Sequence, residues 1–284
     1  MTPTLTIIAD NLAFVESPRW RNGRLWFSDF FDHAVKSVSP SGDLRNELEI
    51  DDHPSGLGWK PDGTLLIVSM TKRNILSWSG EGRASLWADI SETASFHCND
   101  MVVDKAGGAY VGNYGFDLSA HLADRGAAAV LAEHPTATLT YVSPQGIPRI
   151  VADEMHFPNG SIILPDQNIL IVAETLAARL TAFDIEDDGS LSNRRIWAET
   201  GPYIPDGIAL DAEGCIWIAD PIGNACVRIR EGGEVIQRIT TEQPCYACEI
   251  GGLDGRTLFL LTADAFDHRQ PPPTRTARIW ATSL

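Results

Sequence analysis

The hydrophobic positions of this chain fall into short runs separated by turns, and this pattern repeats six times. Each repeat opens with a polar or Pro/Gly corner, runs on as an apolar segment, turns, and returns as a second apolar segment with β-branched or aromatic residues. The corners are Glu16-Ser17-Pro18, Ser55-Gly56-Leu57, Asn99-Asp100-Met101, Asn159-Gly160-Ser161, Asp206-Gly207-Ile208 and Ala247-Cys248-Glu249. The turns are Asn22-Gly23, Asp62-Gly63, Gly107-Gly108, Asp166-Gln167-Asn168, Glu213-Gly214 and Asp254-Gly255. Because most of these turns tolerate positive φ, they predict six β-hairpins.

The spacing of the corners predicts a propeller. Corner positions 16, 55, 99, 159, 206 and 247 lie 39, 44, 60, 47 and 41 residues apart, and a period of this size is typical of one four-stranded blade. A third strand can be drawn after each hairpin, and residues 5–8 resemble the outer strand of the last blade. We therefore predict an all-β, six-bladed β-propeller with a central channel, in which residues 1–284 form one domain.

The 60-residue interval predicts an insertion in the third blade. Residues 116–137 include the Ala-rich segment 127–131, which favours a short helix. The second strand of each blade returns to the face where the first strand began, so the insertion should lie on the same face as the corners. There it is either a lid-like cover of the channel mouth or a surface loop. The Pro-rich loop 270–273 should lie on the same face.

The composition of the chain argues against several classes of function. The formal charge is −16, which argues against nucleic acid because phosphate contacts need clustered Lys and Arg. The chain has neither an apolar run of eighteen residues nor a leader-like start, so we expect a cytoplasmic protein that does not bind membranes. Five unevenly spaced cysteines do not suggest a disulfide framework. The sequence does not predict the oligomeric state.

The corners point to a metal site. Inner strands line the channel of a propeller, so the residues that open them form a ring around its mouth. Four of these six residues, Glu16, Asn99, Asn159 and Asp206, carry an oxygen ligand. Two carboxylates and two amides make an all-oxygen set of charge −2, which suits a divalent cation and favours Ca²⁺, with Mn²⁺, Fe²⁺ and Zn²⁺ as alternatives. Asn-Asp, Asn-Gly and Asp-Gly are also ordinary turn pairs, which is the competing interpretation.

The same motifs resemble the senescence-marker-protein, gluconolactonase and regucalcin-like lactonases. The resemblance covers nearly the whole chain and is carried by the following segments: residues 15–20 (VESPRW), 99–100 (ND), 157–160 (FPNG), 164–166 (LPD), 205–207 (PDG), 210–214 (LDAEG) and 251–258 (GGLDGRTL). It implies that Glu16, Asn159 and Asp206 bind the metal and that Asn99 contacts substrate near it. His97 stands where sugar-lactone members often carry arginine.

The predicted activity is metal-dependent hydrolysis of a lactone or related ester. The metal would polarise the carbonyl and activate water, with Asp206 as the base. His53, His97 and His156 lie within three residues of a corner and are candidate substrate contacts or proton carriers.

Aromatic and apolar residues that follow second strands should form a rim on the same face. Phe31 and Tyr114 are the candidates for substrate contact, accompanied by Phe30, Met70 and Phe116. With His97 in place of arginine, this rim favours lactones with apolar or aromatic substituents over sugar lactones.

Two other functions compete. A phosphotriesterase resembling diisopropyl-fluorophosphatase would use the same fold and ligand set. A non-catalytic propeller that binds metal would need no substrate. Gly-rich phosphate loops and the Gly-x-Ser-x-Gly nucleophile elbow are absent from the sequence, which argues against phosphate-loop and serine-nucleophile chemistry.

Overall fold

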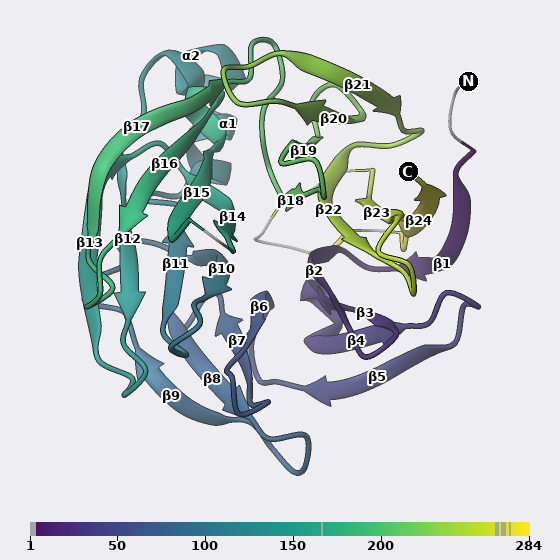
Figure 1. Cartoon of the computed structure of the whole chain (residues 1–284), viewed down its shortest axis with the longest axis horizontal. Coiled ribbons are helices and arrows are strands. Elements are labelled where there is room, and N and C mark those ends of the chain that lie inside the picture. The colour runs from purple at the N-terminus through teal and green to yellow at the C-terminus, as the bar shows by residue number, and fades with distance from the viewer. Residues whose placement is uncertain (1–3, 166, 265–266, 268–270, 273) are drawn as a thin grey trace.

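Six four-stranded antiparallel sheets are arranged around a central axis in the computed structural model (Figure 1). The structure describes residues 4–165, 167–264, 267, 271–272 and 274–284. Two predicted segments fall partly outside them, at position 166 of the fourth hairpin turn and at positions 270 and 273 of the Pro-rich loop. The prediction of an all-β, six-bladed β-propeller is confirmed.

Each sheet is one blade, with its first strand at the channel. Blade 1 contains β2 (Val15–Arg21), β3 (Arg24–Asp29), β4 (Ala34–Val38) and β5 (Leu44–Glu49). Blade 2 contains β6 (Pro54–Trp59), β7 (Leu65–Ser69), β8 (Asn74–Trp78) and β9 (Ser85–Asp89). Blade 3 contains β10 (Cys98–Val103), β11 (Ala109–Asn113), β12 (Ala137–Val142) and β13 (Pro148–Met155).

The second half of the ring repeats this arrangement. Blade 4 contains β14 (Pro158–Leu164), β15 (Ile169–Glu174), β16 (Arg179–Ile185) and β17 (Leu191–Glu199). Blade 5 contains β18 (Ile208–Leu210), β19 (Ile216–Asp220), β20 (Ala225–Ile229) and β21 (Val235–Thr240). Blade 6 contains β22 (Cys245–Gly251), β23 (Thr257–Thr262), β24 (Ala277–Ser283) and β1 (Thr6–Leu12).

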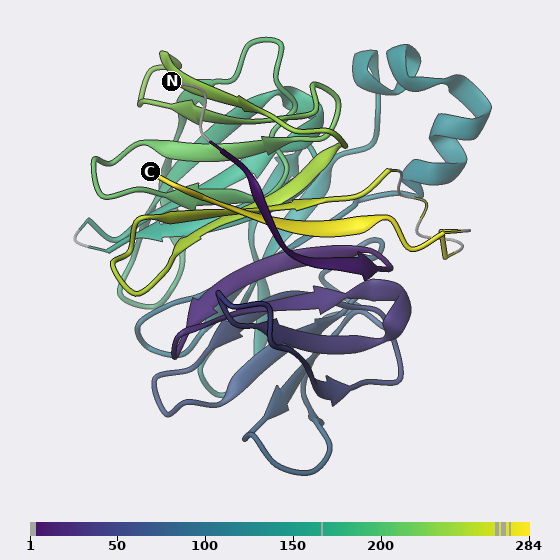
Figure 2. The same ribbon diagram turned by 90° about the vertical axis from the view of Figure 1, so that its right-hand side faces the viewer.

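The ring closes through the N-terminal strand. β1 pairs with β24 as the outer strand of blade 6, so this blade combines the two ends of the described chain (Figure 2). Inner strands contact one another in order, and β22 contacts β2. Pairing β1 with β24 covers an edge that would otherwise be open to another chain. The predicted closure by residues 5–8 is confirmed.

The core consists of apolar layers between neighbouring blades. Phe27 and Leu25 of blade 1, Tyr110 of blade 3 and Trp217 of blade 5 are at most 1% exposed. Each cluster joins side chains of adjacent sheets, such as Ile171 of blade 4 with Ile218 of blade 5. Burial of these layers is the main favourable contribution to folding. It also fixes where each inner strand begins.

A buried polar residue ends the second strand of every blade, none of them more than 1% exposed. These residues are Asp29, Ser69, Asn113, Glu174, Asp220 and Thr262. In three blades the carboxylate accepts a backbone N–H from the segment just before the inner strand: Phe14 N at 3.1 Å, His156 N at 2.8 Å and Ile204 N at 3.3 Å. Such bonds satisfy amides that leave the sheet ladder. They therefore fix the corner of the blade that they belong to.

The insertion of blade 3 forms two short helices, α1 (Leu118–Arg125) and α2 (Ala127–Ala132), which project from one face of the ring (Figure 2). Asp117 caps α1 by accepting the amide of Ala120 at 2.9 Å. Gly126 separates the helices with φ 76° and ψ 161°, a conformation nearly restricted to glycine. No helix of the described residues is long and apolar enough to cross a membrane.

Candidate functional site

The corner residues are positioned by irregularities in the inner strands. The register between the first and second strands shifts at the corner in blade 1 between Glu16 and Arg19, and similarly in blades 2, 3, 4 and 6. Ser17, next to Glu16, has a left-handed φ of 51°. A bulge of this kind bends the strand and redirects side chains. The corners of these five blades are therefore bulges at the channel mouth.

Glycine follows the corner where neighbouring inner strands approach closely. A Cβ on Gly160 would lie 2.6 Å from the carbonyl oxygen of Asp206, and one on Gly207 would lie 2.8 Å from Ala247 Cα. Gly160 N donates to Asp206 O at 3.2 Å, which joins blades 4 and 5. The Asn-Gly and Asp-Gly pairs are thus interblade contacts rather than hairpin turns. They bring Asn159 and Asp206 side by side.

The four predicted oxygen ligands line one cavity of about 420 Å³. Glu16 comes from blade 1, Asn99 from blade 3, Asn159 from blade 4 and Asp206 from the segment that opens blade 5. The last three are 5–8% exposed, and Glu16 is half-buried. Tyr114, also predicted, lines the same cavity. The volume lies within the range of about 300–1,000 Å³ that is typical of small-molecule sites.

Burial and neighbouring negative charges disfavour the charged forms of Glu16 and Asp206 in this cavity. Burial, together with the charges of Asp206 and Asp100, raises the pKa of Glu16 well above its usual value. Burial raises the pKa of Asp206 to about 8, with a hydrogen bond from Asn159 opposing the shift and Asp100 adding to it. Burial, together with the charges of Asp206 and Glu16, raises the pKa of Tyr114. Buried like charges need a cation or protons between them.

A second charged group lies deeper along the channel. Arg19 Nη2 donates to Asp100 Oδ1 at 2.8 Å and to the carbonyl of Met101 at 2.7 Å. This ion pair joins blades 1 and 3. Burial raises the pKa of Glu249 to about 7, and the charge of Arg19 opposes that shift. Arg19 therefore neutralises Asp100 beneath the cavity, while Glu16 and Asp206 have no such cationic partner in the bonds that the structure describes.

The donor set fits a hard divalent cation. Carboxylate and amide oxygens are the ligands that Ca²⁺ prefers, and two buried carboxylates give the compensating charge. Among the described residues, no three or more His, Cys, Asp and Glu side chains form a metal-type cluster. That result is consistent with a set in which half of the ligands are amides. The residues that would hold the cation are Glu16, Asn159 and Asp206, with Asn99 beside them.

Four other predicted residues do not line this cavity in the part of the chain that the structure describes. His53 packs its ring against His33 at 4.9 Å and Phe31 at 5.2 Å. His97 stacks on Phe96 with the ring centroids 4.2 Å apart. His156 Nδ1 lies 2.9 Å from His134 Nε2. Phe31 packs against the apolar cluster around the channel mouth.

The structure adds aromatic residues that the sequence interpretation missed. Phe14, Phe157 and Tyr246 line the cavity, together with Phe30, which had been expected at the rim. Phe14 contacts Tyr246 with ring centroids 4.8 Å apart, and Phe157 contacts Tyr114 at 4.6 Å. Phe14 and Phe157 lie two residues before a corner, a position that His53 and His97 occupy in blades 2 and 3. This shared repeat position was the available signal.

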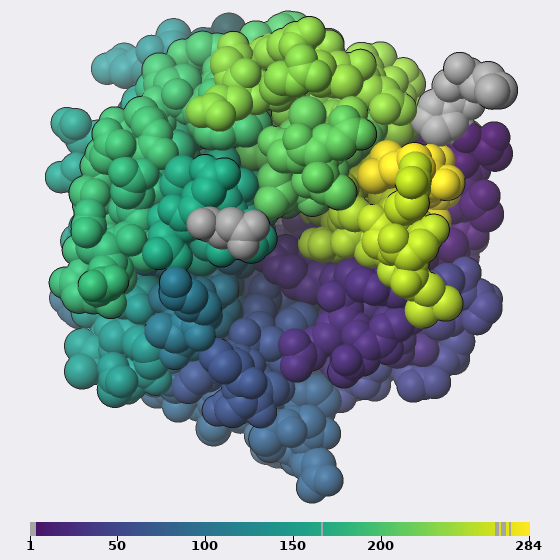
Figure 3. All heavy atoms as spheres, viewed as in Figure 1, coloured from purple at the N-terminus to yellow at the C-terminus, as the bar shows by residue number. Residues whose placement is uncertain are grey.

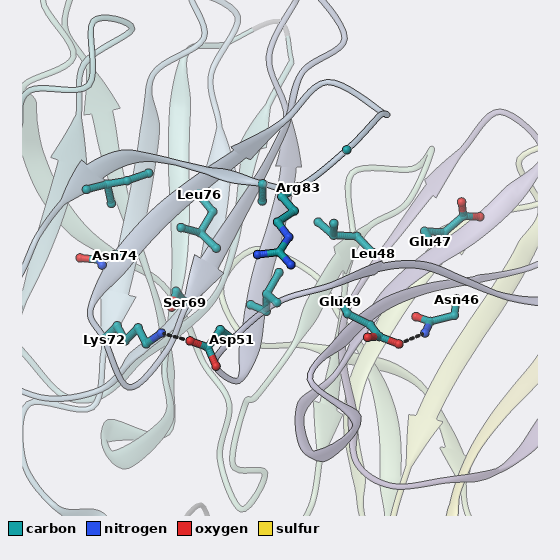
Figure 4. Close-up of a pocket in the computed structure, with 14 residues that line it drawn as sticks. Asn46, Glu47, Leu48, Glu49, Asp51, Ser69, Lys72, Asn74, Leu76 and Arg83 are labelled. Atoms are coloured by element: carbon teal, nitrogen blue, oxygen red, sulfur yellow. Dashed lines mark hydrogen bonds and ion pairs between the residues drawn. The ribbon is translucent and has the colours of Figure 1, made fainter.

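The other pockets are less suited to be a catalytic site than the cavity at the channel mouth. The largest, about 850 Å³, is a groove on the outer rim between blades 1 and 2 (Figure 4). Its polar side chains pair with one another, Lys72 with Asp51 at 3.2 Å and Asn46 with Glu49 at 3.1 Å. The face turned away from the helices is hollowed near its centre (Figure 3). A pocket of about 270 Å³ beside Arg19 and Glu249 is smaller than typical ligand sites.

Comparison with known proteins shows to which family a chain with this fold and cavity belongs. The profile of the SMP-30/gluconolactonase/LRE-like region matches residues 14–264, and the chain belongs to this family. Regucalcin of Sus scrofa is 26% identical over 268 residues, covering 90% of this chain and 85% of the relative. Regucalcin of Danio rerio is 26% identical over 258 residues, covering 87% and 82%.

Solved structures share the fold. A luciferin-regenerating enzyme superposes with a TM-score of 0.78 at 16% identity, covering 99% of this chain and 95% of the other. A gluconolactonase of Xanthomonas campestris gives 0.75 at 19% identity, covering 99% and 89%. A regucalcin of Agrobacterium tumefaciens, described as a calcium-binding protein, gives 0.77 at 17% identity, covering 99% and 95%.

Proposed function

We propose that this protein is a hydrolase of lactones or related esters that depends on a divalent cation. The observation that carries the proposal is the cavity at the channel mouth, where the half-buried carboxylate of Glu16, the buried carboxylate of Asp206 and two buried amides converge beneath an apolar wall. Membership of a family that includes gluconolactonases supports the reaction class. Ca²⁺ is the favoured cation because every donor is oxygen.

The cation would be held by Glu16, Asn159 and Asp206, with Asn99 at its side. When bound, it supplies a Lewis acid for the substrate carbonyl and lowers the pKa of water. Asp206 serves as the base that takes a proton from the attacking water. Its place beside Asn159 in the cavity allows one carboxylate to contact both water and cation.

The reaction balances with one water. The water oxygen bonds to the lactone carbonyl carbon, and its proton passes to the Asp206 carboxylate. The bond between carbonyl carbon and ring oxygen then breaks, and Asp206 returns the proton to the departing ring oxygen. Asn99 donates an amide N–H that orients the substrate. The product is a hydroxy acid, and its carboxylate is repelled by the acidic lining of the cavity.

The test begins with protein stripped of metal by a chelator. Ca²⁺, Mn²⁺ or Zn²⁺ is restored singly, and acid release from a panel of lactones and carboxylic esters is followed by pH-stat. We expect Asp206→Asn to lower kcat/KM at least 10³-fold and to weaken cation binding. Asp187→Asn removes one exposed carboxylate outside the cavity and should behave as wild type. Wild-type turnover by Asp206→Asn would contradict the mechanism.

The competing functions are outcomes of the same screen. Hydrolysis of an uncharged organophosphate triester faster than of every lactone would assign the site to a phosphotriesterase. Tight cation binding without hydrolysis of any ester would assign a binding protein, as the description of the Agrobacterium regucalcin suggests for that relative.

A further inference from the structure

The cavity carries negative but no positive side chains among its described lining residues. Glu16, Asp206 and Asp264 line it, without any Lys, Arg or His. A divalent cation would balance Glu16 and Asp206, which leaves Asp264. Asp264 accepts the side-chain amide of Gln243 at 2.6 Å. Among the lining residues that the structure describes, an anionic substrate would therefore find no cationic side chain to pair with, so an uncharged substrate is favoured.

Two of the side chains that line the cavity, Asn159 and Thr175, use their hydrogen-bond donors within the protein. Asn159 Nδ2 donates to Thr175 Oγ1 at 3.2 Å, and Thr175 Oγ1 donates to the carbonyl of Pro205 at 2.8 Å. These donors are already used inside the protein. A sugar lactone would have to pair its hydroxyl groups with the remaining polar side chains, such as Asn99, Tyr114 and Tyr246, and each hydroxyl left unpaired against the apolar wall is costly.

The wall on the side of the insertion is apolar. Leu118 and Leu122 of α1, and Val130 and Leu131 of α2, line the cavity. Val130 is fully buried, whereas Leu122 is 39% exposed and Leu131 46% exposed. Across the opening, Ile222 is 77% exposed and also lines the cavity. Exposed apolar side chains gathered around one opening are typical of a ligand site.

The apolar wall is held in place by histidines of the insertion and of blade 4. His134 Nδ1 lies 2.8 Å from the carbonyl of Val130, which can only accept, so His134 Nδ1 donates. Its Nε2 lies 2.9 Å from His156 Nδ1, directly before the cavity residue Phe157. This link ties α2 to the corner of blade 4. The wall is therefore part of the cavity before any ligand arrives.

We infer that helices α1 and α2, together with Ile222, form a subsite for the uncharged alkyl or aryl substituent of a lactone. The carbonyl of that lactone then lies at the carboxylate end of the cavity, beside Asn99. This assignment rests on the proposed lactonase function. It names the substrate class as apolar, ring-substituted lactones and places sugar lactones outside it.

A homologous series of γ-lactones tests the subsite. From γ-butyrolactone to γ-decalactone, with Ca²⁺ saturating, kcat/KM should rise about three- to fourfold per methylene until the cavity is filled, since each buried CH₂ contributes about that factor. Glucono-δ-lactone should be at least tenfold less efficient than γ-decalactone. A flat series, or a tenfold preference for the sugar lactone, would overturn the inference.

Two variants test whether the rise of kcat/KM per methylene depends on the apolar wall of the cavity. Leu122→Asp should reduce the rise per methylene to less than twofold. Leu86→Asp is the matched control, because Leu86 is an exposed leucine on β9 at the outer rim. If Leu122→Asp fails to fold, Ile222→Asp replaces it, since Ile222 is more exposed. An unchanged slope in the folded variant contradicts the subsite.

Binding without hydrolysis separates this inference from the proposed function. γ-Lactams with methyl to hexyl chains resist hydrolysis, and calorimetry of the Ca²⁺-loaded protein should show Kd falling with chain length, but not in Leu122→Asp. Chain-dependent binding in the absence of any lactone turnover supports the subsite and contradicts the lactonase. Turnover of glucono-δ-lactone without chain-dependent lactam binding supports the lactonase and contradicts the subsite.

Discussion

Asn159 combines a structural hydrogen bond with a candidate ligand atom. Its amide nitrogen donates to Thr175 Oγ1, and its hydrogen bond to Asp206 lowers that residue's pKa. Both interactions use the nitrogen, so a cation would meet Oδ1. The blades have their own apolar layers, which do not depend on this side chain.

We predict that Asn159→Ala weakens Ca²⁺ binding at least tenfold. The free energy of unfolding should fall by only about 1–2 kcal/mol, because two hydrogen bonds, to Thr175 and Asp206, are lost while Thr175 keeps its bond to Pro205. Calorimetric titration and thermal melts measure the two effects. Asn46→Ala, in the rim groove, serves as the control for amide loss. Unfolding at room temperature, or unchanged affinity, would contradict the prediction.

Residues at the repeat corners could be predicted because repetition aligns them. Glu16, Asn99, Asn159 and Asp206 share one position in the blade, and the structure brings all four to one cavity. The pair between Arg19 and Asp100 spans 81 residues and two blades, and no local pattern indicates it. His53 and His97 share their repeat position with lining residues, but the aromatic rings that they contact, Phe31 edge to face and Phe96 stacked, could not be predicted from spacing.

At the scale of elements, the positions of the strands could be predicted from the alternating apolar runs. The hydrogen bonds that link a strand to a neighbouring corner could not. Strand β7 (Leu65–Ser69) follows the Asp62-Gly63 turn, as the hairpin pattern of the sequence predicts. Its link to the preceding corner depends on Asp52, which is 7% exposed and accepts from Ser69 Oγ at 2.6 Å and from the amides of Thr71 and Lys72 at 3.0 Å. In the sequence, no pattern distinguishes Asp52 from the many other acidic residues. The insertion likewise was expected as a helix, but its division at Gly126 depends on a backbone angle.

Asp52 gives a prediction for the pH dependence of stability. Burial alone would raise its pKa, but the hydrogen bonds from Ser69, Thr71 and Lys72 lower it below the ordinary value. A carboxylate with a depressed folded pKa stabilises the protein above its unfolded pKa of about 3.9, and this stabilisation is lost as the pH falls through the folded value. Asp52→Asn should therefore cost about 2 kcal/mol at pH 7 and markedly less near pH 3.

Urea unfolding of wild type and Asp52→Asn at both pH values measures that difference. Comparing the two proteins at each pH cancels the other titrating groups. Asp187→Asn, an exposed acid, should show no difference at either pH. An equal cost at pH 7 and pH 3 would show that the charge of Asp52 contributes nothing.

For the whole molecule, the proposed cation site lies where blades meet. Glu16 belongs to blade 1, Asn99 to blade 3, Asn159 to blade 4 and Asp206 to the start of blade 5. Without a cation, two buried carboxylates oppose one another at the centre of the ring. A ligand that binds only the folded ring stabilises it by mass action, and about 2.7 kcal/mol is gained at a hundredfold excess over Kd.

The melting temperature should therefore rise with the logarithm of Ca²⁺ concentration once Kd is exceeded. At a hundredfold excess the expected rise is roughly 4–5 °C for a chain of this size. Asp206→Asn should flatten the dependence, whereas Asp52→Asn should lower the whole curve and keep its slope, because Asp52 lies outside the cavity. NaCl at matched ionic strength controls for screening. Equal slopes in wild type and Asp206→Asn would mean that Ca²⁺ stabilises the ring from elsewhere, and the site at the channel mouth would have to be abandoned.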